Sequence, residues 1–195
     1  IDYLSLKYDE AIYKFEKAIK LYPSHKNLDY AYYMTAICYY EQINSETNDG
    51  LNNIKSLKNF QEVLIRFPRS EYAKDSRQKI IFINENIAAK HMDIGMFYFK
   101  QKKYLAALGR YKNVIENHSK SKFTPEALYR LVEIYTILGI DEEARKIAAV
   151  IIYNYPKSKW YSYAYKIVEK DEIEKNKVSL TKKIFNLFNK DDGQK

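Results

Sequence analysis

The chain of 195 residues has little cysteine and glycine, and each shortage excludes a class of structure. Cys38 is the single cysteine, so no disulfide can form within the chain, and we expect its thiol to be a small core group. Five glycines are too few for a sheet-rich fold with many turns. No apolar run reaches the roughly 18 residues that a membrane-spanning helix needs.

Arrangements typical of an enzyme or a metal site are also missing. His25, His91 and His118 are far apart in sequence, and none has a second metal ligand at helical spacing. There is no phosphate-binding glycine loop, no GxSxG motif and no Cys/His pair with a supporting context. We therefore predict a non-enzymatic protein with no metal and no cofactor.

The charge is moderately basic but not concentrated in one stretch. There are 33 basic and 25 acidic residues, which give a formal net charge of +8, and no run of five or more like charges occurs. Because a nucleic-acid site needs clustered basic residues, this composition favours a solvated, mildly basic surface over nucleic-acid binding.

What the chain has in abundance is helical periodicity, shown most clearly near its C-terminal end. Apolar residues recur at i, i+3, i+4 and i+7 over 125–138 and again over 141–154, which predicts two amphipathic helices. Thr124 is the expected N-cap with Pro125 at the first helical position, and Gly139 is expected to be left-handed between the helices. The sequence thus predicts a helical hairpin.

A hairpin cannot bury both of its faces alone, so it should recur along the chain. The second helix contains Ala144, Ala148 and Ile151, and Pro156 follows it. Three other segments have the same spacing: Ala107, Tyr111, Val114 and Ser119; Ser56, Phe60, Val63 and Pro68; and Ala11, Phe15, Ala18 and Pro23. A motif of Pro or Ser, any residue, Ser, any residue and an aromatic residue also repeats, at 68–72, 119–123 and 156–160.

This pattern is similar to the tetratricopeptide repeat and predicts an all-α, right-handed α-α superhelix of helical hairpins. Ala107, Ala144 and Ala148 are expected at close helix contacts. An insertion, SETNDGLN, follows the second helix, with its turn at Asn48-Asp49-Gly50. We expect helices at 5–22, 28–43, 51–66, 104–118, 125–138, 141–154 and 159–170. The segment 70–102 has no proline and no internal turn signal before Gly95, so we expect it to form one long or gently broken helix.

The predicted solenoid covers 1–170, and a polar tail follows at 171–195, disordered or weakly docked. The first repeat lacks a complete partner helix, so we expect more chain before residue 1. The sequence begins without an initiator methionine or a signal peptide.

Several runs resemble the BamD (ComL) family of outer-membrane assembly lipoproteins over about residues 8–170. They are NLDYAYYMTAICYY, FPRSEYAKDSRQKIIFINENIAAKHM, YFKQKKYLAALGRYKNVIE and PEALYRLVEIYTILGIDEEARKIAAVIIYNYPKSKWY. The resemblance implies a non-enzymatic scaffold subunit of the β-barrel assembly machinery at the periplasmic face of the bacterial outer membrane. It also implies an N-terminal lipid anchor, absent from this chain. Implied partners are the periplasmic domains of the core barrel-assembly protein, other lipoproteins of the complex and unfolded outer-membrane protein substrates.

Candidate binding residues follow from the resemblance and from the repeat register. The resemblance places at Arg110 a contact with an acidic residue of the core protein, and Ala107 and Tyr111 beside it predict a guanidinium in solvent. The register predicts a concave aromatic and methionine groove formed by Tyr30, Tyr33, Met34, Tyr40, Met92, Met96, Phe99, Tyr129, Arg130 and Glu133. Packing between repeats is the alternative role of these tyrosines. A soluble peptide-binding adaptor of the cell envelope is the alternative function.

Overall fold

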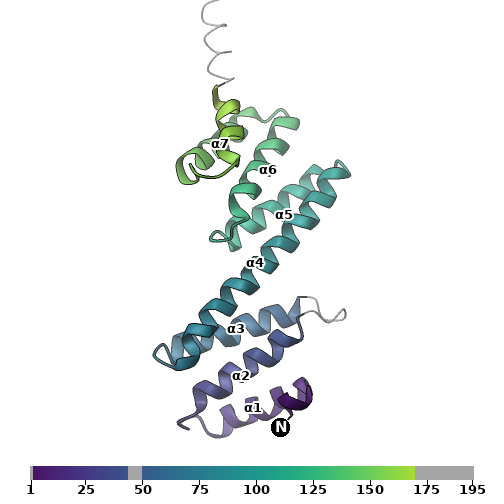
Figure 1. Ribbon diagram of the computed structural model, residues 1–195. Coiled ribbons are helices and arrows are strands. Elements are labelled where there is room, and N and C mark those ends of the chain that lie inside the picture. Colours follow the sequence, from purple (N-terminus) through teal and green to yellow (C-terminus); the bar gives the residue numbers. More distant parts are fainter. Residues whose placement is uncertain (1, 44–49, 170–195) are drawn as a thin grey trace, which may run out of the picture. The chain divides into compact units, whose positions relative to one another are not determined.

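The computed structural model describes residues 2–43 and 50–169, and this part of the chain forms helices, turns and connecting segments without a strand (Figure 1). The predicted all-α fold is confirmed. The tail at 171–195 and most of the predicted insertion lie outside the described residues. The elements are the 3-10 helix η1 (Tyr3–Ser5) and the α-helices α1 (Tyr8–Leu21), α2 (Leu28–Glu41), α3 (Leu51–Arg66), α4 (Glu71–Lys100), α5 (Tyr104–Asn117), α6 (Thr124–Ile137) and α7 (Asp141–Asn154), followed by helical residues 160–169.

The long helix predicted from the absence of proline is confirmed as α4, which runs unbroken for 30 residues. Gly95 lies inside it and does not form a turn. A Cβ atom at Gly95 would lie 2.6 Å from Cε1 of Tyr111, whose ring belongs to α5 and is fully buried. Glycine is therefore required at this position because the tyrosine ring packs directly against the backbone of α4.

The repeated serine motif has a structural explanation at all three of its positions. The Oγ atoms of Ser70, Ser121 and Ser158 accept hydrogen bonds from the backbone N–H of the aromatic residue two positions later, at 3.2, 3.2 and 3.3 Å. Each serine side chain thus stabilises the turn that connects one helical hairpin to the next.

The start of α6 differs from the prediction. Phe123 occupies the N-cap position, and Thr124 is the first helical residue. The Thr124 hydroxyl donates to the backbone carbonyl of His118 at 3.1 Å, so it holds the preceding turn and does not cap the helix. The prediction for Gly139 is confirmed, since its φ is +71° between α6 and α7.

The chain divides into two compact units, unit 1 (Ile1–Ile87) and unit 2 (Ala88–Lys195). In unit 1, α2 packs against both α1 and α3, and in unit 2, α6 packs against both α5 and α7. The predicted alanine contacts are confirmed in unit 2, where Ala107, Ala144 and Ala148 are at most 1% exposed. The extension of one solenoid over 1–170 and its right-handed sense remain predictions.

Candidate functional site

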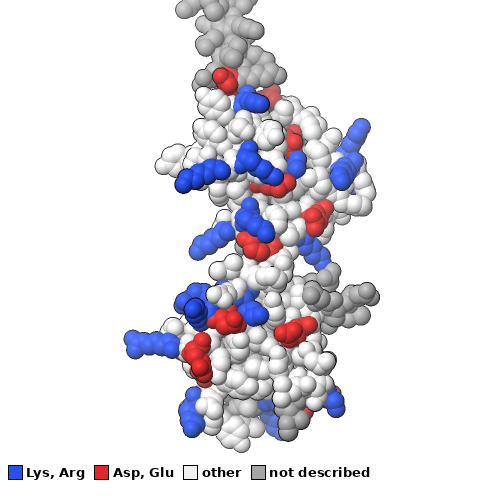
Figure 2. Space-filling view, viewed as in Figure 1, with Lys and Arg blue, Asp and Glu red and all other residues white. Residues whose placement is uncertain are grey.

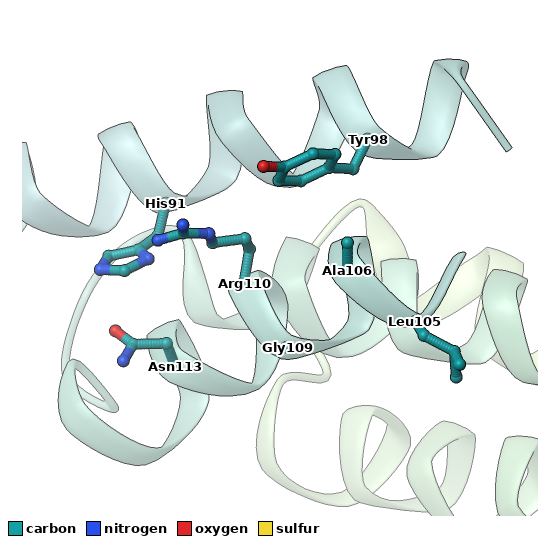
Figure 3. Close-up of a pocket in the computed structure, with 7 residues that line it drawn as sticks. All are labelled: His91, Tyr98, Leu105, Ala106, Gly109, Arg110 and Asn113. Carbon is teal, nitrogen blue, oxygen red and sulfur yellow. The ribbon is translucent and has the colours of Figure 1, made fainter. Parts of the chain in front are cut away.

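A hollow between α4 and α5 gathers polar side chains within unit 2. Its volume is about 390 Å³, and it is open to solvent. Figure 3 shows side chains from both helices directed toward it. Its lining residues are His91, Tyr98, Leu105, Ala106, Gly109, Arg110 and Asn113.

Arg110 lies at the edge of this hollow because of its place in the turn of α5. Ala107 and Tyr111, on either side of it in the helical register, are fully buried against neighbouring helices. Arg110 as a whole residue is half-buried, and the expectation of a guanidinium in solvent stays a prediction. Its side chain runs along α4 and ends beside the imidazole of His91 (Figure 3). Among the described residues, no carboxylate forms an ion pair with Arg110.

His91 is the neighbour that the sequence analysis did not connect with Arg110. Its Nδ1 atom is buried and has no hydrogen-bond partner in the described part of the chain. Burial lowers the pKa of His91, and the positive charges of Arg110, His118 and Lys90 lower it further. A neutral imidazole beside an unpaired guanidinium leaves the hollow with a net positive charge. The only sequence signal was the seven-residue spacing of His91 and Tyr98, which places both on one face of α4.

The hollow can accommodate a negatively charged group from a partner. Arg110 presents planar N–H donors that suit a carboxylate, and Asn113 and Tyr98 add polar atoms near its rim (Figure 3). Gly109 has no heavy atom within 4 Å of the position a Cβ would take, so a partner can approach the α5 backbone closely there. No group of three or more His, Cys, Asp or Glu side chains in the described ranges is arranged to hold a metal ion.

The groove residues in unit 1 are mainly engaged in packing. Met34 is buried and therefore presents little surface. Tyr30 is the most exposed of them at 41%, and its ring contacts Tyr72. Tyr33 stacks on Tyr72 and donates a hydrogen bond to Asp75 at 2.8 Å, whereas Tyr40 lies against other rings. The packing role that the sequence left open is thus the observed one for Tyr33 and Tyr40.

The first groove residues of unit 2 lie on α4. Met92 is buried in the core, and Phe99 packs against the same core cluster. Met96 is half-buried. Met92, like Met34, is therefore a core residue and not an anchor on a groove surface.

The remaining groove residues lie on α6 and form a compact network. Arg130 binds Glu126 at 3.2 Å and Glu133 at 2.7 Å, and its guanidinium lies over the ring of Trp160. Tyr129 stacks on Trp160, with ring centroids 4.8 Å apart. This arginine is already paired, in contrast to Arg110.

The successive helical hairpins and the buried alanines at their contacts are those of an all-α, tetratricopeptide-like helical-repeat protein. Its candidate site is a polar surface hollow suited to binding. A family model described as "Outer membrane lipoprotein", YfiO, matches residues 2–151. The chain belongs to this family, which includes the BamD proteins.

Three relatives illustrate the similarity, each named "Outer membrane protein assembly factor BamD". The protein of Rickettsia prowazekii (strain Madrid E) is 42% identical over 167 residues, which cover 86% of this chain and 66% of the relative. That of Caulobacter vibrioides is 43% identical over 166 residues, covering 85% of this chain and 54% of the relative. That of Neisseria meningitidis (strain Z2491) is 27% identical over 167 residues, covering 80% of this chain and 62% of the relative. The chain thus spans between about half and two thirds of the length of these relatives.

None of the described helices is both long and apolar enough to cross a membrane. The predicted Cys38 environment is confirmed, because this residue is fully buried in unit 1.

Proposed function

We propose that this chain is a non-enzymatic scaffold subunit of the β-barrel assembly machinery, acting at the periplasmic face of the outer membrane. In this role it binds the periplasmic domains of the core barrel-assembly protein and helps to present unfolded outer-membrane proteins to it. Membership of the YfiO/BamD family and the relatives' name, outer membrane protein assembly factor, support this assignment.

The observation that carries the proposal is the state of Arg110. Arg110 is a half-buried residue whose side chain ends beside a partly buried His91 (Figure 3), and no carboxylate of the described chain pairs with it. A guanidinium without an ionic partner at the edge of a hollow presents planar paired donors, so the hollow favours a partner that supplies a carboxylate. In the proposed complex, an acidic side chain of the core protein binds Arg110 in a bidentate manner.

Calorimetric titration against the purified periplasmic domains of the core protein tests this role. We expect Arg110→Ala to weaken binding about thirtyfold, because truncating a central charged anchor costs about 2 kcal/mol. Arg110→Lys should restore only part of the affinity, since an ammonium group lacks the planar paired donors.

Lys112→Ala is the matched control, because Lys112 is an exposed cation only two positions away on α5. Its loss should change the affinity little, as is usual for charges at a rim. Equal affinities for the parent and for Arg110→Ala, with both proteins folded, would reject the role of Arg110. Absence of any binding by the parent chain would reject the proposed function itself.

A further inference from the structure

The turn between α4 and α5 carries a second surface, which shares only Leu105 with the hollow beside Arg110. We call it the basic tip, and its members are Phe97, Lys100, Lys102, Lys103 and Leu105. Phe97 and Leu105 are 57% and 78% exposed, and all three lysines are exposed. No described carboxylate forms an ion pair with any of these lysines. The basic tip thus combines free cations with exposed apolar side chains.

The region around the basic tip is depleted of acidic residues. Residues 94–115 contain five basic residues and no Asp or Glu. Over the whole sequence, unit 1 has 12 basic and 12 acidic residues, whereas unit 2 has 21 basic and 13 acidic residues. The entire net charge of the chain is therefore carried by unit 2. Figure 2 shows Lys and Arg side chains projecting at the end of the α4–α5 pair.

The tip has a defined backbone conformation. The backbone N–H groups of Lys102 and Lys103 donate to the carbonyls of Phe99 and Tyr98, at 2.9 and 3.0 Å. Lys102 has a φ of +58°, a left-handed conformation that glycine adopts more easily. A lysine at this position costs stability relative to glycine, yet it adds a cation at the apex of the turn.

The α6–α7 turn shows that the basic tip is not a general consequence of the hairpin. There the left-handed residue is Gly139, and Ile137 and Ile140 are exposed. The residues that follow are Asp141 and two glutamates. Both turns therefore expose apolar side chains. In the α4–α5 turn their neighbours in the sequence are lysines, whereas in the α6–α7 turn they are carboxylates.

We propose that the basic tip binds the surface of an anionic phospholipid membrane. Lysine ammonium groups suit lipid phosphates, and the apolar bodies of Phe97 and Leu105 can enter the boundary between headgroups and acyl chains. An acidic protein partner is less favoured, because the three lysines share the turn with exposed apolar side chains and lack the planar donors that suit carboxylates. Binding occurs at the membrane surface, since the tip is far too short to span a bilayer.

Co-sedimentation of the full chain with vesicles tests the proposal. Vesicles of about three parts phosphatidylethanolamine to one part phosphatidylglycerol should bind the parent, and vesicles of neutral phosphatidylcholine should not. The triple variant Lys100→Gln, Lys102→Gln and Lys103→Gln should bind the anionic vesicles at least about tenfold more weakly, because each lysine near such a surface contributes several-fold. High salt should also weaken binding of the parent to anionic vesicles.

The matched control removes the same charge elsewhere in unit 2, by Lys120→Gln, Lys157→Gln and Lys166→Gln. All three are exposed cations outside the basic tip. This variant should retain most of the parent's vesicle binding. Equal losses in the two triple variants would show that net charge alone is responsible and would overturn the proposal.

A second pair of variants tests the apolar contribution. Phe97→Ser should weaken vesicle binding several-fold, because Phe97 is 57% exposed and does not line the hollow beside Arg110, whereas Ile140→Ser in the α6–α7 turn should leave it unchanged. Circular dichroism confirms folding of each variant. Binding of a poly-glutamate peptide with no binding to anionic vesicles would assign the tip to an acidic protein and also overturn the proposal. Arg110 is intact in all of these variants, so failure here is separate from failure of the proposed function.

Discussion

Units 1 and 2 are built from similar helical hairpins, but their polar side chains have different surroundings. In unit 1, the hydroxyls of Tyr33 and Tyr39 donate to Asp75 and Glu16, at 2.8 and 3.2 Å. In unit 2, the hydroxyl of Tyr111 is buried and has no partner among the described residues. Unit 1 also has a buried hydroxyl without a partner among the described residues, on Ser76, and unit 2 has two further such atoms, on His91 and Arg130.

The charge follows the same division. Unit 1 is formally neutral, and unit 2 carries a formal charge of +8 from 21 basic and 13 acidic residues. Polar groups that are paired within a unit stabilise it but offer little to a partner, whereas unpaired cations favour binding. The comparison shows that the repeat pattern specifies the residues that pack between helices. It does not specify the charged and polar residues on the surface, which differ between the two units. The candidate partner site and the basic tip both lie in unit 2.

The largest expected effect comes from disturbing the packing of α4 on α5. Gly95→Ala places a methyl group within 3.0 Å of the Tyr111 ring and should destabilise unit 2 by about 1–3 kcal/mol. The single tryptophan, Trp160, reports on unit 2, and the single cysteine, Cys38, reports on unit 1. Urea unfolding followed by Trp160 fluorescence should show a lower midpoint, while labelling of Cys38 without denaturant should be unchanged. Faster labelling of Cys38 in Gly95→Ala would contradict this expectation, because it would show that unit 1 opens when unit 2 is destabilised.

Gly109→Ala is the control for this change, because it adds the same methyl group to α5. Nothing lies within 4 Å of the new atom, so better helix propensity should stabilise the protein by about 0.5–1 kcal/mol. Burial raises the pKa of the Cys38 thiol to about 11, which keeps its labelling slow while unit 1 stays closed. Destabilisation by Gly109→Ala would contradict the open position of this glycine.

A smaller difference in stability is expected between the variants of two tyrosines, Tyr33 and Tyr111. Tyr33→Phe removes a hydroxyl that donates to Asp75 and should destabilise the protein by about 1 kcal/mol. Tyr111→Phe removes a buried hydroxyl without a partner in the described chain, so it should be neutral or stabilising. Denaturant titration of both variants measures the difference. Equal losses would mean that the Tyr111 hydroxyl has a partner, such as an ordered water.

The smallest expected effect is the contribution of His91 to the pH dependence of stability. The pKa of His91 is lowered by burial and by the charges of Arg110, His118 and Lys90, so the unfolded chain binds a proton more readily than the folded chain. The stability that this supplies is present above the ordinary histidine pKa of about 6.5 and is lost as the pH falls below it. Denaturation between pH 7 and pH 5 should therefore show a steeper loss for the parent than for His91→Gln. Identical slopes would place the acid sensitivity elsewhere.

Much of the fold could be predicted because helical periodicity is a local property. The bounds of α3 and α7 agree with the prediction to the residue, and α4 was expected from a stretch without proline. The start of α6 was missed because Thr124 can either cap its own helix or bind the preceding turn, and the contact with His118 decided between them. Gly95 was noted only as a possible turn signal, because the reason for a glycine there, the Tyr111 ring, lies on another helix.

The candidate site was predictable only in part. Arg110 was singled out by family resemblance, and its position beside two buried residues followed from the register of α5. Its neighbour His91 could not be found in this way, because it comes from the preceding helix. Met34 and Met92 were placed on a surface groove because the register distinguishes the faces of one helix without showing which faces its neighbours cover.

The sequence by itself determined the helices, their hairpin spacing, the buried alanine positions and the family. The tertiary structure decided which residues from separate helices meet, such as Tyr111 with Gly95 and Arg110 with His91, and it left Phe97 and Leu105 exposed. The physical reason is that periodicity depends on backbone geometry within one helix, whereas burial and charge environment depend on how different helices pack.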